Sequence, residues 1–205
     1  YSVDWRKEGA LIERYPGPTQ GLKGEYFKEG ITYNIEKRSG RRFGVMPETS
    51  VYSEKGVAIF TDISIWRMCA YLNSRMVTYL MLGQNVDRSW KVGMVSKIPW
   101  VPSLKKTDID VKAKRIVGSI CSLRRSQYRS PYYFAPLLIR MLPYEPSGLP
   151  SHRDHPHRSF TEKIDIPEAP SVGLGESIVE IAERARGFEA RLTDRCERLS
   201  DAIDD

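Results

Sequence analysis

The chain reads GITYN at 30–34, FGVM at 43–46 and VAIF at 57–60, three short apolar runs bounded by glycine, proline or serine. Apolar and polar residues alternate in parts of residues 24–60, and a period of two is typical of strands that bury one face. The basic segment KRSGRR at 37–42 separates the first two runs and is expected to form a hairpin loop. We predict a small sheet here.

Helical patterns follow the predicted strands. The spacing predicts a helix from about residue 63 to 79 with Asp62 as its N-cap, and a second helix that Asp108 opens. Between them, residues 91–100 are expected to return to strand and turn. Residues 132–141 are expected to form a further short helix. The fold class is therefore α+β, a small mixed sheet with packed helices.

The last part of the chain has the clearest helical pattern. Apolar or small residues recur every three or four positions, and the opposite face is charged, which is typical of a coiled coil or of a helix docked in a groove. These seam residues are Ile178, Ile181, Ala185, Phe188, Leu192, Cys196, Leu199 and Ile203. The Pro-, Ser- and His-rich stretch before them has no periodicity and is expected to be a surface linker.

These patterns divide the 205 residues into four segments. They are a strand-rich segment at 1–102, a basic helical layer at 103–142, a linker at 143–175 and the amphipathic helix at 176–205. No apolar run approaches the roughly 18 residues that a membrane span requires, so no membrane contact is expected.

Positive charge is concentrated in the middle of the chain. Residues 61–160 carry 16 Lys and Arg against 6 Asp and Glu, a net +10, whereas residues 161–205 carry 6 against 12, a net −6. A basic region of this kind is typical of proteins that bind polyanions, although an acidic protein partner would fit it as well. The acidic end is expected to point away from any phosphates.

Cysteine usage and the histidines bear on compartment and metal binding. Cys69, Cys121 and Cys196 are far apart and odd in number, which fits free thiols in a reducing cytoplasm. All three histidines lie in residues 152–157, where with Asp154 they offer imidazole nitrogens to a metal. A polar surface loop is the simpler interpretation of that segment.

Five short phrases follow one another in the chain. They are the glycine-initiated run at 30–34, Arg-Phe-x-x-x-Pro at 42–47, Gly-x-x-Ile-Phe at 56–60, Leu-Asn-Ser at 72–74 and Gly-x-x-x-x-Ile-Pro at 93–99. In this order they resemble the C-terminal target-recognition region of large adenine-N6 DNA methyltransferases. The families are the PglX methyltransferase of BREX phage defence and the type IIG restriction enzymes, in which methylation and cleavage are fused.

The resemblance implies a unit that binds double-stranded DNA and presents an adenine to a methyltransferase catalytic domain outside this chain. S-adenosylmethionine would bind that domain, because the Gly-rich cofactor turn and the Asn/Asp-Pro-Pro-Tyr/Phe loop of such enzymes are both missing here. No cofactor is therefore expected in this chain. An Asn-Pro-Thr phrase usual in those families is also missing, since residues 83–90 read GQNVDRSW.

Seven basic residues are the expected DNA contacts. Arginine grips a guanine edge or a phosphate with two hydrogen bonds, and a loop tip can enter the major groove. These residues are Lys37, Arg38, Arg41, Arg42, Lys97, Arg124 and Arg125. Arg41 has an alternative structural role, pairing with a carboxylate of a neighbouring strand. Asn73 is expected to satisfy backbone groups between helix and sheet.

Two other functions remain open from the sequence. The chain could be a protein-interaction module that acts or self-associates through the terminal helix. It could also be a nuclease-associated subunit with a metal at residues 152–157.

Overall fold

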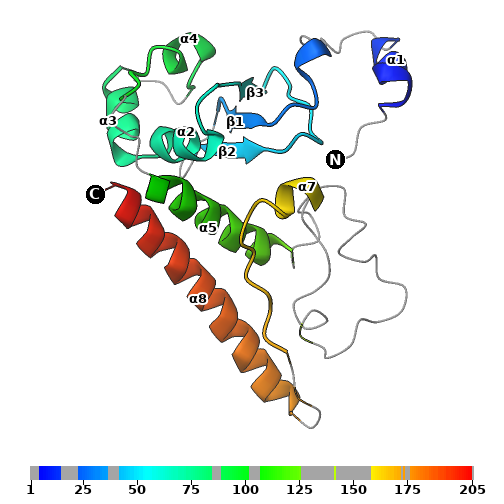
Figure 1. The fold of residues 1–205 in the computed structure, drawn as a ribbon, viewed down its shortest axis with the longest axis vertical. Helices are drawn as coiled ribbons and strands as arrows, with labels where there is room; N and C mark the ends of the chain where they lie inside the picture. Colours follow the sequence, from blue (N-terminus) through cyan, green and yellow to red (C-terminus); the bar gives the residue numbers. More distant parts are fainter. Residues whose placement is uncertain are drawn as a thin grey trace.

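The computed structural model describes residues 5–14, 23–36, 42–84, 89–101, 107–125, 141, 158–171, 173 and 176–204. A small sheet with short helices lies at one end, and two long helices run side by side beneath it (Figure 1). The α+β class is confirmed. Two short helical elements precede the sheet, α1 (Arg6–Glu13) and the 3-10 turn η1 (Lys23–Glu25).

The sheet has three antiparallel strands, β1 (Gly30–Asn34), β2 (Phe43–Met46) and β3 (Gly56–Ile59), in the order β2-β1-β3. The central strand β1 buries Ile31 and Tyr33, because side chains two residues apart share one face. The three apolar runs are therefore strands, as predicted.

The single helix predicted from residue 63 to 79 is wrong. Two helices, α2 (Ile65–Leu72) and α3 (Arg75–Gln84), meet at a sharp turn. Ser64, not Asp62, caps α2 by accepting the Arg67 N–H, and the Ser74 hydroxyl accepts the Val77 N–H at the start of α3. Serine favours helix caps over helix interiors, which explains the break.

The strand expected within residues 91–100 is also wrong. This segment forms the single-turn helix α4 (Val92–Val95), followed by a turn. The backbone of Lys91 accepts hydrogen bonds from the amides of Met94 and Val95, so the chain coils instead of extending. The buried Val95 side chain joins the core beneath the sheet.

Two long helices, α5 (Thr107–Arg124) and α8 (Ile178–Asp204), pack along each other (Figure 1). The buried residues of α8 are Ala185, Phe188 and Leu192, all members of the predicted seam. The terminal helix is therefore confirmed, and its seam is covered by α5 of the same chain.

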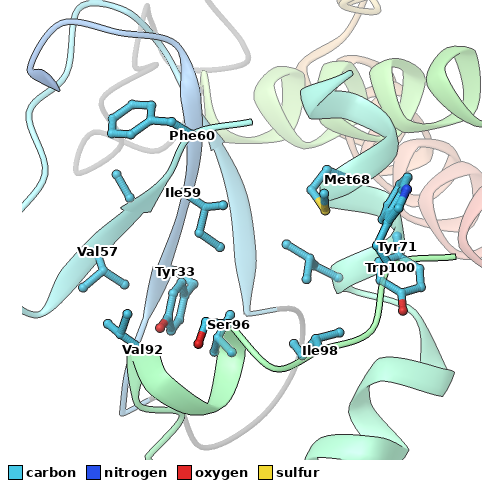
Figure 2. Close-up of a pocket in the computed structure, with 13 residues that line it drawn as sticks. Tyr33, Val57, Ile59, Phe60, Met68, Tyr71, Val92, Ser96, Ile98 and Trp100 are labelled. Atoms are coloured by element: carbon cyan, nitrogen blue, oxygen red, sulfur yellow. The ribbon is translucent and has the colours of Figure 1, made fainter. Parts of the chain in front are cut away.

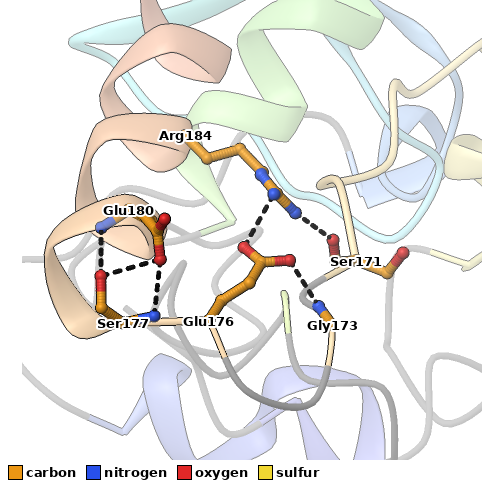
Figure 3. A network of polar contacts seen from close by, with 6 residues as sticks. All are labelled: Ser171, Gly173, Glu176, Ser177, Glu180 and Arg184. Atoms are coloured by element: carbon orange, nitrogen blue, oxygen red, sulfur yellow. Dashed lines mark hydrogen bonds and ion pairs between the residues drawn. The ribbon is translucent and has the colours of Figure 1, made fainter.

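Polar contacts hold both ends of α8. At its start, Ser177 and Glu180 exchange hydrogen bonds as a capping box, and Arg184 pairs with Glu176 at 2.7 Å (Figure 3). These contacts satisfy amides that the first turn of a helix leaves without partners. At its other end, the Asp204 carboxylate accepts hydrogen bonds from the amide and the guanidinium of Arg75, at 2.9 and 3.0 Å. The final helix is thereby joined to α3.

Residues 158–171 of the predicted surface linker or loop pack onto the helices instead of lying free on the surface. This segment begins with α7 (Arg158–Thr161) and then runs extended across α5. Phe160 and Ile164 are buried, and the Phe160 ring stacks on Trp66 at 5.9 Å between centroids. Isolated apolar anchors in an extended segment carry no periodicity, so the sequence pattern did not reveal them. The helix predicted at 132–141 lies outside the described residues except for Met141, which is buried.

The extended segment approaches α5 most closely at Gly118. A Cβ atom placed there would collide with the backbone carbonyl of Asp165. Backbone on both sides of this contact cannot move aside as a flexible side chain can, so the crossing requires glycine. Among the described residues, no helix is both long and apolar enough to cross a bilayer.

Replacing Gly118 by alanine should therefore lower the free energy of unfolding, by about 1–3 kcal/mol as for other overpacked sites. Gly187→Ala is the matched control, because Gly187 is also inside a helix but its Cβ would meet only the end of Arg191 at 3.4 Å. That variant should gain about 0.5–1 kcal/mol from the better helix propensity of alanine. Urea unfolding of both variants measures the difference, and equal effects would contradict the close crossing.

Candidate nucleic-acid interface

Asn73 ties helix α2 to strand β2 through its side-chain amide. Its Oδ1 accepts the Phe43 N–H at 3.1 Å, and its Nδ2 donates to the Phe43 carbonyl at 3.0 Å and to the Cys69 carbonyl at 2.9 Å. Among the described strands, β2 pairs only with β1, and on its other edge the asparagine supplies the partners of the Phe43 backbone. The structural role predicted for Asn73 is confirmed.

Arg42, the residue before Phe43, closes the end of β1. Its guanidinium donates to the carbonyls of Asn34 and Ile35, at 3.0 and 2.8 Å, and its Cζ lies 4.3 Å from the centre of the Trp90 ring. Burial lowers the pKa of Arg42, with the neighbouring Tyr33 acting in the opposite direction. Hydrogen bonds and ring stacking therefore occupy this arginine within the chain.

Arg42, predicted as a DNA contact, uses its side chain to hold β1 and Trp90. The pairing with a carboxylate considered for Arg41 stays a prediction, whereas Arg42 bonds two backbone carbonyls of the neighbouring strand and its end. Lys37, Arg38 and Arg41 lie outside the described residues. Their part of the interface stays a prediction.

Trp90 brings a second segment to the same place. Its amide donates to the Ile35 carbonyl at 3.0 Å, and its ring is buried beside Phe43. The described residues before position 37 and after position 88 therefore meet at the hydrogen bond between Ile35 and Trp90. Sequence reasoning missed Trp90, although an aromatic residue between the basic residues Arg88 and Lys91 was a usable signal.

Lys91 and Lys97 lie at either end of α4, and both are exposed. Neither forms an ion pair within the described part of the chain, so their ammonium groups face solvent. The DNA contact predicted for Lys97 stays a prediction, and Lys91 was not predicted as one. The Trp90–Ile35 hydrogen bond brings the segment that carries these lysines to the end of β1.

The two predicted arginines at the end of α5 differ. Arg124 is exposed, whereas Arg125 is 5% exposed and donates to Glu168 at 3.3 Å. Arg125 holds the extended segment 165–171 against α5 and is not accessible to a phosphate, so its assignment as a DNA contact is corrected. Arg124, in the last turn of α5, borders a cavity that is also lined by α2 and α8.

Two cavities accompany this surface. One, of about 320 Å³, opens between the sheet and α2 and is bordered by α4 (Figure 2). The other, of about 270 Å³, lies between α2, α5 and the end of α8. Burial raises the pKa of the Cys121 thiol beside this second cavity to about 12, so the thiol stays protonated at neutral pH and is no nucleophile.

The described part of the chain contains no group of three His, Cys, Asp or Glu side chains that could bind a metal ion. Residues 152–157 with their histidines lie outside it. In comparisons with known proteins, no family model, curated protein or solved structure matches the chain.

Replacing Arg42 by alanine should destabilise the fold by about 2 kcal/mol, since hydrogen bonds from a charged group typically contribute about 1.5–3 kcal/mol. Arg42→Lys should recover little, because an ammonium has no planar group that can stack on Trp90 while donating to both carbonyls. Arg115→Ala, at an exposed position of α5, is the control and should change stability by about 0.5 kcal/mol or less. Thermal unfolding that ranks Arg42→Ala with this control would show that the contact is dispensable.

Proposed function

We propose that this chain is the DNA target-recognition portion of an S-adenosylmethionine-dependent adenine-N6 DNA methyltransferase of phage defence or restriction-modification. It binds double-stranded DNA and positions it for a catalytic domain outside this chain. S-adenosylmethionine belongs to that domain, and this chain holds no cofactor of its own.

The observation that best supports the proposal is that separate phrases of the resemblance bond to one another. Asn73 of Leu-Asn-Ser bonds the backbone of Phe43, and Arg42 of Arg-Phe bonds the end of the strand formed by the glycine-initiated phrase at 30–34. Residues that are distant in sequence are thus joined by hydrogen bonds around β1 and β2. A chance likeness of short phrases gives no reason for their side chains to converge.

The charges fit this function. Lys91 and Lys97 are exposed, and the basic segment 37–41 immediately precedes Arg42 in the chain. Lysine and arginine contacts to phosphates would orient the duplex, and arginines of the basic segment would read base edges. The acidic α8 lies along α5, beneath the sheet and on the far side from α4 (Figure 1).

The protein-interaction alternative has less support. Its working surface was the apolar seam of the terminal helix, and Ala185, Phe188 and Leu192 of that seam are buried within this chain. A partner would have to displace α5 or use the charged outer face of α8. The nuclease-subunit alternative depends on residues outside the described part.

The direct test is the salt dependence of binding to a short DNA duplex, measured by fluorescence anisotropy. Lys91→Gln/Lys97→Gln should weaken binding and reduce the slope of log K against log salt by about 1 for each phosphate that is no longer neutralised. Arg186→Gln/Arg191→Gln, on the exposed face of α8, removes the same charge elsewhere and should change neither value appreciably.

Equal weakening in the two double variants would mean that only net charge matters, and the interface would be wrongly placed. Absence of salt-dependent DNA binding by the unmodified chain would contradict the proposed function itself. Circular dichroism of both variants controls for folding.

A further inference from the structure

The cavity bordered by α4 is lined on several sides by aromatic rings. Its volume of about 320 Å³ is within the range of sites that hold small molecules. Tyr33 and Phe60 border it from the sheet side, and Tyr71 and Trp100 from the opposite wall (Figure 2). The two rings of the opposite wall contact each other edge to face, with centroids 5.2 Å apart. Aliphatic side chains and Ser96 complete the lining, and edge-to-face or stacked contacts with the four rings favour a flat aromatic ligand.

The polar groups of the cavity are few and differ in their bonding. The Tyr71 hydroxyl donates to the Pro99 carbonyl, so it is used within the chain. The Tyr33 hydroxyl is buried and has no hydrogen-bond partner among the described residues. In Figure 2 it points toward the α4 side of the cavity, near Val92 and Ser96. A buried hydroxyl without a partner is unfavourable, and a ligand with a nitrogen or oxygen at this point would relieve it.

Charge at the rim indicates what kind of aromatic ligand fits. Val92, Val95 and Ser96 of α4 line the cavity, and the exposed Lys91 and Lys97 directly flank these residues in the chain. No acidic residue is among the described residues that line it. An apolar cavity with four aromatic rings, next to a helix that two exposed lysines flank in the chain, complements a base attached to a phosphate backbone.

We propose that this cavity receives one unstacked base of the bound DNA. The base lies among the rings of Phe60, Tyr71 and Trp100, and the phosphates beside it lie near Lys91 and Lys97. Stacking on aromatic side chains is tolerant of base identity, whereas a hydrogen bond to the Tyr33 hydroxyl would add some selectivity. This inference rests on the proposed function and specifies which form of DNA the site prefers.

The test compares two duplexes of the same sequence, one fully paired and one with a single unpaired adenine, by fluorescence anisotropy at constant salt. The unmodified chain should bind the second duplex about tenfold more tightly, which corresponds to about 1.4 kcal/mol. Ser96→Trp places a large side chain at the exposed edge of the cavity and should remove this preference while keeping affinity for the paired duplex. Thr78→Trp adds the same bulk on the exposed surface of α3 and should preserve the preference.

The outcomes separate the two proposals. Salt-dependent binding of both duplexes with equal affinity would overturn the base site and leave the DNA-binding function standing. A preference that survives Ser96→Trp in a folded protein would also overturn it. Binding of free deoxyadenosine monophosphate as tightly as the unpaired duplex would show a free-nucleotide site instead of a DNA site. Failure to bind any DNA would contradict the proposed function from which the inference starts.

Discussion

The rest of the structure depends on the hydrogen bonds between the Asn73 side chain and the backbone of Phe43. An unpaired edge strand exposes amides and carbonyls that need partners. Asn73 supplies a donor and an acceptor at once, as a neighbouring strand would, and it also bonds the Cys69 carbonyl at the end of α2. One side chain therefore fixes the distance between helix and sheet. Replacing it by an apolar residue would leave buried backbone groups without partners.

Two parts of the molecule take their positions from this junction. The chain turns after Asn73, so α3 begins at Arg75, where Asp204 can reach it and join the end of α8. On the sheet side, fixing Phe43 places the preceding Arg42 over Trp90 and against the end of β1. The segment after Trp90 is thereby held where α4, which Lys91 and Lys97 flank in the chain, borders the cavity. The positions of Arg42, Trp90 and α4 therefore depend on the hydrogen bonds between Asn73 and Phe43.

Much of this arrangement could be predicted from the sequence, and the failures have physical reasons. The strands and the terminal helix follow from apolar periodicity, and the role of Asn73 followed from the Leu-Asn-Ser phrase. The break between α2 and α3 was missed because Ser74 caps a helix within an otherwise continuous helical pattern. Residues 158–171 were missed because a few isolated anchors, such as Phe160, suffice to hold an extended segment. At the candidate site, positive charge led to the prediction of Arg42 and Arg125 as DNA contacts. Only the tertiary contacts reveal that Arg42 bonds the end of β1 and that Arg125 pairs with Glu168. The place of Lys91 also could not be predicted, since it depends on α4 being a helix beside a cavity.

The most direct test of the Asn73 junction is amide hydrogen exchange in Asn73→Ala, followed residue by residue by NMR under conditions in which the protein stays folded. The Phe43 amide should exchange much faster than in the unmodified protein, because its acceptor is gone. The Trp90 amide, bonded to Ile35, should also lose protection if the junction positions the interface. Amides in the middle of α8 should keep their protection. Unchanged exchange at Phe43 and Trp90 would contradict the claim that Asn73 organises this end of the molecule.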